Sequence, residues 1–233
     1  MSGAGQVDVY NLALSRLDLS QRVQSLTEQT PQAGYCNAFY DRARKVVLEQ
    51  CYWSFATQAG ALALLLDQQT LINPSQILYP GWRYIYSRPA GTLKAQAVTT
   101  SLGLRAFPHL GYWWGSQGYW SSNWGRYRPP WAEMLDQVTQ PPGNSIDILT
   151  DCPYAWLIYT VDAPNVAIWP ESMIDCVAWH LSTLIAGPAS ANQKAKEMAL
   201  KMAQLSLSRA LAQNLNEMQE DPYPESPSIQ ARF

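Results

Sequence analysis

The chain has 233 residues, of which 47% are hydrophobic, 12% aromatic and only 15% charged, and its formal net charge is −2 at pH 7. The lack of a basic excess argues against a protein that grips nucleic acid, because phosphate binding needs clustered lysine and arginine. Low charge and many aromatics are typical of a surface that partners cover, although an unusually aromatic core would give the same composition.

Four cysteines occur, widely spaced and without a CxxC pair: Cys36, Cys51, Cys152 and Cys176. This spacing is not that of a secreted disulfide framework, and it favours a reducing cytoplasm. The N-terminal residues contain no basic-then-apolar signal region, and the longest apolar run, residues 59–66, is too short to span a bilayer. We therefore expect a soluble protein that is made in the cytoplasm and has no contact with a membrane.

Helical periodicity opens the chain. The segment VDVYNLALSRL predicts a first helix, because its apolar residues recur at helical spacing: Val7, Tyr10, Leu14 and Leu17. Thr30 followed by Pro31 predicts the start of a second helix, since threonine is a good N-cap and proline fits the first turn. Its predicted buried stripe is Cys36, Phe39, Tyr40, Ala43, Val46, Val47 and Cys51. The charged residues predicted to lie mostly outside that stripe are Asp41, Arg42, Arg44 and Lys45.

The middle of the chain, from about Gly81 to Val161, has strand signals. RYIYS and SIDILT alternate or nearly so, and AWLIYTV is a short run rich in β-formers, with Pro, Gly and Asn between them. These segments predict three strands of a small sheet. An aromatic stretch is inserted between the first and the second.

Two further helices follow. Pro170 and Glu171 open the first, and Gly187 followed by Pro188 ends it. Its predicted buried face is Met173, Ile174, Val177, Ala178, Leu181, Leu184 and Ile185. After Ser190, a plausible cap, a longer helix runs to about Gln219. Its predicted seam is Ala195, Met198, Met202, Leu205, Ala212 and Leu215.

The predicted fold class is α+β and mainly helical, as one domain over residues 1–233. Helices at about residues 5–60 and 170–220 form a bundle, and the region of about 78–165 forms a small inserted antiparallel β-domain with a long aromatic loop. The last 13 residues, 221–233, contain three prolines and no periodicity, which predicts an extended tail.

Catalytic signatures are scarce. His109 and His180 each lack a second histidine or cysteine at metal-ligand spacing, and we expect His180 to be a hydrogen-bonded structural residue. The sequence contains no GxSxG, GxGxxG or Walker motif. Acidic residues near the predicted strands have no spacing that fixes a catalytic pair, so turn and strand-end roles are expected for Glu133, Asp136, Asp147 and Asp151. We expect no enzymatic activity, no metal and no cofactor.

The stretch GYWWGSQGYWSSNWGRYRPPW, residues 111–131, holds five of the chain's ten tryptophans and three tyrosines. It could be a self-packed hairpin, a sugar-binding platform or a protein interface. If half of its eight aromatics were exposed, they would form a patch of about 600 to 1,000 Å², more than monomers usually expose. We therefore favour an interface, with these partner-binding residues: Tyr112, Trp113, Trp114, Tyr119, Trp120, Trp124, Arg126, Tyr127, Arg128 and Trp131.

The run CNAFYDRARKVVLEQCYWSFA, residues 36–56, resembles the signature helix of the head-to-tail adaptor proteins of short-tailed bacteriophages, also called tail tubular protein A. That family shows a C-x-x-F-Y-D-x-x-R-x-x-V-L pattern followed by W-x-F-A. The matching positions are Cys36, Phe39, Tyr40, Asp41, Arg44, Val47, Leu48, Trp53, Phe55 and Ala56.

Three more segments are similar to the family. They are the N-x-A-L-x-R-L of residues 11–17, the GWRYIYSRPA of residues 81–90, and a helix that ends at GPASANQK before a long alanine-rich helix. The resemblance extends from about Val7 to Gln219. The region from about Leu102 to Trp131 departs from the family because it is much richer in tryptophan, so no family role carries over to it.

The resemblance implies a helical bundle with a small β-domain and a role in assembly without catalysis. Twelve copies would form a ring below the portal protein in the neck of the virion, extend the DNA channel and dock the nozzle (tail tubular protein B) and fibres. A near-neutral chain suits a channel through which DNA passes without specific binding. The tail would dock on the portal through Tyr223, Ile229, Arg232 and Phe233; its alternative is a disordered terminus.

Two other functions stay open at this point. One is a tail component that binds or cleaves carbohydrate through the aromatic loop, which saturable glycan binding would reveal. The other is a free-standing helical scaffold with no phage connection.

Overall fold

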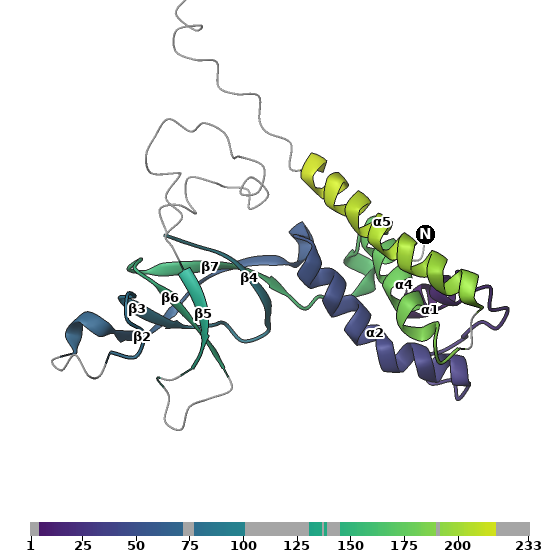
Figure 1. Cartoon of the computed structure of the whole chain (residues 1–233), viewed down its shortest axis with the longest axis horizontal. Coiled ribbons are helices and arrows are strands. Elements are labelled where there is room, and N and C mark those ends of the chain that lie inside the picture. The colour runs from purple at the N-terminus through teal and green to yellow at the C-terminus, as the bar shows by residue number, and fades with distance from the viewer. Residues whose placement is uncertain are drawn as a thin grey trace, which may run out of the picture. The chain divides into compact units, whose positions relative to one another are not determined.

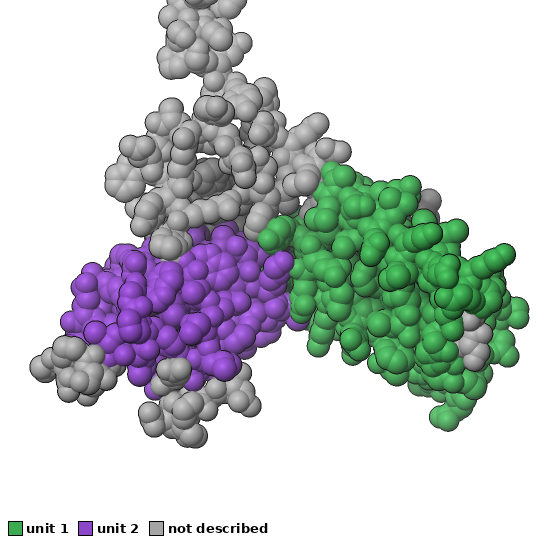
Figure 2. Space-filling view, in the orientation of Figure 1, with its two compact units in different colours: residues 1–56, 160–214 green, residues 57–159, 215–233 purple. Residues whose placement is uncertain are grey.

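The computed structural model describes residues 5–71, 77–100, 131–136, 138, 145–189 and 192–217. The chain divides into two compact units, a helical unit of residues 1–56 and 160–214 and a β unit built on residues 57–159 (Figure 2). The predicted fold class is confirmed. The N- and C-terminal helices pack together, and two small antiparallel sheets are inserted between them in the sequence.

The helical unit contains four long helices (Figure 1): α1 (Gln6–Ser15), α2 (Pro31–Gln50), α4 (Glu171–Ile185) and α5 (Gln193–Glu217). Helix α2 begins where the sequence predicts, because the Thr30 side chain accepts a hydrogen bond from the Ala33 backbone N–H at 3.4 Å. Helix α4 packs against both α1 and α2. Its predicted apolar face is buried except at Leu184, which is half-buried, and Met173, Val177 and Leu181 are completely covered. Helix α4 is therefore the centre of the helical core.

The predicted seam of α5 is correct at Ala195 and wrong at Met198 and Leu205. Met198 and Leu205 are 55% and 40% exposed, and the buried stripe consists of small residues instead: Ala195, Ala199, Ala203, Ser206 and Ala210. Small side chains allow close approach to α4, where Ser206 meets Cys176. The N-cap is Asn192, whose side chain accepts from the Ala195 backbone N–H at 2.7 Å. The predicted cap, Ser190, lies outside the described residues.

The β unit contains two sheets. One has the strand order β1-β7-β4 and the other β2-β3-β6-β5. The strands are β1 (Thr57–Ala61), β2 (Ala63–Asp67), β3 (Tyr84–Ser87), β4 (Thr92–Thr100), β5 (Trp131–Leu135), β6 (Ile146–Thr150) and β7 (Ala155–Val161). The three predicted strands are present as β3, β6 and β7, but they do not form one sheet. Strands β3 and β6 pair with each other, whereas β7 belongs to the other sheet.

The main core of the β unit is formed by side chains from both sheets. Tyr86 and Ile148 from the four-stranded sheet are buried together with Val98 and Leu157 from the three-stranded sheet. Leu62, which joins β1 to β2, is also in this cluster, so a single extended segment contributes an edge strand to each sheet. The sequence does not predict this segment as strands because its alanines and a glycine are weak β-formers.

The opposite face of the four-stranded sheet is covered by the segment that precedes β3. Tyr79 packs there against Ile85 and Leu149. The buried side chain of Gln68 fixes the segment, because its amide N–H groups donate to the carbonyls of Tyr79 and Trp82 at 2.9 and 2.7 Å. Its carbonyl oxygen accepts from the backbone N–H of Tyr79 at 3.1 Å. The amide is thus satisfied on both sides, as burial requires.

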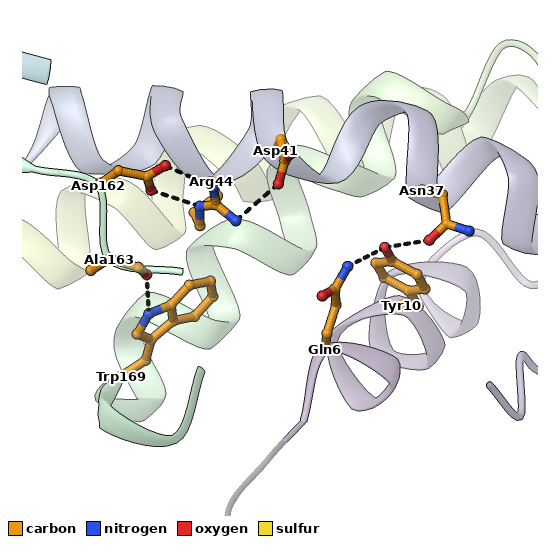
Figure 3. A network of polar contacts seen from close by, with 8 residues as sticks. All are labelled: Gln6, Tyr10, Asn37, Asp41, Arg44, Asp162, Ala163 and Trp169. Atoms are coloured by element: carbon orange, nitrogen blue, oxygen red, sulfur yellow. Dashed lines mark hydrogen bonds and ion pairs between the residues drawn. The ribbon is translucent and has the colours of Figure 1, made fainter. Parts of the chain in front are cut away.

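Arg44 of α2 departs from the sequence prediction. It was predicted to lie mostly outside the apolar stripe, yet it is only 6% exposed. Its Nε and Nη2 donate to the two carboxylate oxygens of Asp162, each at 2.9 Å, and its Nη1 donates to Asp41 at 2.9 Å (Figure 3). Burial alone would lower the Arg44 pKa, but the hydrogen bonds and charge of Asp162 outweigh it and raise the pKa. A bidentate partner therefore compensates the burial of the charge.

Removing the bidentate partner of Arg44 is expected to destabilise the protein far more than removing the other carboxylate. Asp162→Ala leaves a buried guanidinium without its main partner, and we expect a loss of about 2 to 4 kcal/mol in the free energy of unfolding. Asp41 is 73% exposed at the side chain, so Asp41→Ala should lose less than about 0.5 kcal/mol. Urea unfolding of both variants measures the difference. Equal losses would contradict the assignment.

Candidate partner-binding surfaces

Most of the predicted binding residues lie outside the described residues. This holds for Tyr112 to Arg128 of the aromatic loop and for Tyr223, Ile229, Arg232 and Phe233 of the tail. Trp131 is described. It is the first residue of β5, pairs with Thr150 of β6 and packs, half-buried, against the main core of the β unit. Trp131 thus has a structural role in the sheet, which does not depend on whether the aromatic loop binds a partner.

Strand β5, which follows the aromatic loop in the sequence, is held at several points. Glu133 forms an ion pair with Arg88 at 3.4 Å. After the strand, the two carboxylate oxygens of Asp136 accept hydrogen bonds from the Val138 backbone N–H and the Ser145 hydroxyl, both at 2.9 Å. These contacts fix β5, the strand that follows the aromatic loop in the sequence, within the β unit.

Two of the carboxylates, Asp136 and Asp151, have the predicted turn and strand-end roles, whereas Glu133 and Asp147 lie within strands β5 and β6. Besides Glu133 and Asp136, Asp151 accepts from the Arg83 backbone N–H at 2.8 Å, and Asp147 is buried within β6. Within the described ranges, no group of three or more histidine, cysteine or acidic side chains could hold a metal ion. No helix in that part of the chain has both the length and the apolarity that crossing a membrane requires.

None of the four cysteines forms a disulfide, and all four are buried. Burial raises the pKa of Cys36 to about 12 and that of Cys176 to about 11, and it also raises the pKa of Cys152. These thiols therefore stay protonated at neutral pH and are poor nucleophiles. Burial also lowers the pKa of His180, which favours its neutral form. None of these groups is arranged for chemistry.

Tyr154 is a surface feature that the sequence analysis missed. It lies in the turn between β6 and β7, is 86% exposed, and has a φ of 56°. Left-handed backbone is unfavourable for a bulky residue, and Pro153 before it matches a type II turn, whose next position normally holds glycine. An exposed aromatic in a strained position is a reason to look for a function. In the sequence, only the proline directly before Tyr154 indicates this turn.

The core of the β unit holds this turn in place. The hydroxyl of Tyr86 donates to the Cys152 carbonyl at 2.9 Å and accepts from the Ala155 backbone N–H at 3.5 Å. It thereby bridges the two backbone groups that face each other across the turn. The strained conformation of Tyr154 is thus imposed by the fold around it.

Relief of this strain is expected to stabilise the protein. Tyr154→Gly should raise the free energy of unfolding by about 0.5 to 1 kcal/mol, since glycine adopts positive φ without strain but loses more entropy on folding. Tyr154→Ala keeps a Cβ at the same φ and should change stability by less than about 0.3 kcal/mol. Thermal or urea unfolding measures both variants. A gain of the same size for alanine would show that the side chain, and not the backbone, is unfavourable.

Apolar side chains are exposed at both edges of the four-stranded sheet. Leu64 on β2 is 52% exposed, and Met134 and Leu135 on β5 are 45% and 68% exposed. Both strands have a neighbour on one side only among the described strands. Edge strands with exposed apolar residues are favourable sites for association.

Helix α5 presents a second candidate surface on the helical unit. Lys194, Met198, Lys201, Leu205 and Arg209 recur at intervals of three and four residues and are all exposed. They therefore form one face of the helix, both apolar and basic. No ion pair of these three basic residues occurs within the described part of the chain.

The segments that resemble the adaptor family contribute to the framework. The Asn11 side chain donates to the Val23 carbonyl at 2.9 Å and accepts from its N–H at 2.8 Å. Arg16 pairs with Asp175 of α4, and Gly81 has a φ of 93°, which glycine adopts readily. The contacts of Asn11 and Arg16 hold a loop and a helix to α1, and the positive φ of Gly81 shapes the turn before β3.

The chain was compared with models of known protein families and with curated proteins. No family model matches the chain, and no curated protein shows a significant match.

Proposed function

We propose that this chain is a structural virion protein, the head-to-tail adaptor of a short-tailed bacteriophage. Copies of it form a ring below the portal protein, extend the DNA channel and dock the tail nozzle and fibres. The observation that carries the proposal is the agreement between motif and fold. The fold that the resemblance implies, helices from both ends of the chain with an inserted β-domain, is the fold observed.

The signature segment supports the proposal through its residues. Cys36, Tyr40, Val47 and Leu48 are buried on α2, and Arg44 is the buried cation that binds Asp162. These residues of the family pattern pack together in the core of the helical unit. A shared core of this kind is a physical reason for two sequences to resemble each other. Because many functions share one fold, the role in the virion needs its own test.

The exposed surfaces are compatible with a subunit that is covered on several sides. Ring assembly requires two different flanks on each copy, because each subunit meets the next head to tail. The apolar edges of the four-stranded sheet and the strained Tyr154 are candidates for such contacts. The formal net charge of −2 suits a channel wall that does not retain DNA.

Binding to the portal tests the proposal directly. Light scattering after size exclusion is measured on the protein alone and after mixing it with the portal ring of its own phage. We expect a complex that contains one copy of the chain per portal subunit, twelve if the ring number of the family applies. A protein that never co-elutes with the portal, at any salt concentration tested, would refute the adaptor function.

The aromatic loop and Trp131 are expected to respond differently to substitution. Replacing Trp113, Trp114, Trp120 and Trp124 together by alanine should leave the free energy of unfolding nearly unchanged but block tail completion, if the loop binds a partner. Trp131→Ala should lose about 2 kcal/mol, because this side chain packs against the core. Urea unfolding and in vitro tail assembly are measured on both variants. A large stability loss in the fourfold variant would favour a self-packed hairpin.

A further inference from the structure

We propose that helix α5 is the helix through which copies of this chain contact one another, with each of two opposite flanks packed against α5 of a neighbouring copy. The first flank consists of Met198, Met202 and Leu205, and the second flank consists of Leu200, Leu207 and Leu211. This inference rests on the proposed function, because it requires a ring. It names the surface on which one copy of that ring meets the next.

The side of α5 that packs against its own unit is narrow. With 3.6 residues per turn, its members fall within about 40° of one line along the helix. A helix on the surface of a monomer needs an apolar stripe only about 100° wide, so this stripe is enough to attach α5 to the outside of the helical unit (Figure 1). The stripe consists of small residues that are at most 6% exposed: Ala195, Ala199, Ala203, Ser206 and Ala210.

Larger apolar side chains continue on both sides of this buried stripe. Met198 and Leu205 of the first flank are 55% and 40% exposed, and Leu200 of the second flank is 58% exposed. The other members of the two flanks are half-buried. At about 100° per residue, each flank lies roughly a quarter turn from the buried stripe, one on either side. The apolar arc of α5 therefore spans about 240°, more than twice the width that one packing face needs.

Two apolar flanks match two neighbours. One exposed flank would suit a single partner, whereas every copy in a ring has a neighbour on each side, and each contact joins two different surfaces. The two flanks differ as such a contact requires, because the first has two methionines and a leucine and the second has three leucines. The side of α5 opposite the buried stripe is polar and suited to water, with these exposed residues: Glu197, Lys201, Gln204 and Ser208.

Disulfide formation between singly substituted copies tests the contact. Met198→Cys or Leu205→Cys places one thiol on the first flank, and Leu200→Cys or Leu207→Cys places one on the second. The native cysteines do not interfere, because all four are buried. A disulfide needs Cα atoms about 4.4 to 6.8 Å apart. Thiols on the same flank of adjacent helices do not meet this condition, since the helix axes are about 8 to 10 Å apart.

Each variant alone, and each of the four mixtures of a first-flank with a second-flank variant, is assembled on the portal ring of its own phage and mildly oxidised. We expect covalent dimers in at least one mixture, at several times the yield of either variant alone. The matched control is Ser208→Cys, which places the thiol on the polar side of α5. Mixed with any of the four variants, it should give no more dimer than it gives alone.

The same samples separate this inference from the proposed function, because co-elution with the portal reports adaptor binding and the disulfides report the contact. A portal complex without disulfides in any of the four mixtures would overturn the inference and leave the adaptor function standing. Equal yields of dimer in one variant alone and in its mixtures would also overturn it, because the contact would then be two-fold symmetric. A chain that never binds the portal would refute both.

Discussion

The helical unit depends on one buried cation. Arg44 lies in the middle of α2 and binds both carboxylate oxygens of Asp162, the residue that follows β7. From there the chain runs to Trp169, whose indole N–H donates to the Ala163 carbonyl at 2.9 Å (Figure 3). The Trp169 ring also stacks on Tyr40. Helix α4 begins two residues later. The Arg44 contact therefore ties α2 to the segment that leads into the central helix α4, against which α1 and α2 pack.

Apart from helix α5, which belongs to both groups, the segments that give the chain its resemblance to phage adaptors differ from the surfaces that could bind partners. Positions such as the buried Arg44 and the half-buried Asn11 hold helices and loops in place. The exposed apolar residues lie elsewhere, on the sheet edges, at the β6–β7 turn and along α5. This separation has a physical reason, because a buried framework tolerates little change in shape, whereas surface contacts follow the partner.

The sequence was sufficient to predict the fold class, the Thr30 cap and most of the buried face of α4, because periodicity and N-cap chemistry act locally. Thr30 and the face of α4 are examples. It was insufficient for α5, where small residues replaced larger ones in the core, since the distance between two helices is a tertiary property. The burial of Arg44 also could not be predicted, because its partner Asp162 is far away in the sequence. Of the predicted binding residues, only Trp131 could be located, and it packs into the β unit.

A double-mutant cycle on Arg44 and Asp162 tests the central claim most directly. The free energy of unfolding is measured for Asp162→Ala in the native background and in an Arg44→Met background, where no buried cation is left to pair. The buried-cation account predicts that most of the loss caused by Asp162→Ala disappears in the Arg44→Met background, because the loss comes from stranding the guanidinium. An equal loss in both backgrounds would show that the two residues act independently and that the helical unit is held together by other contacts.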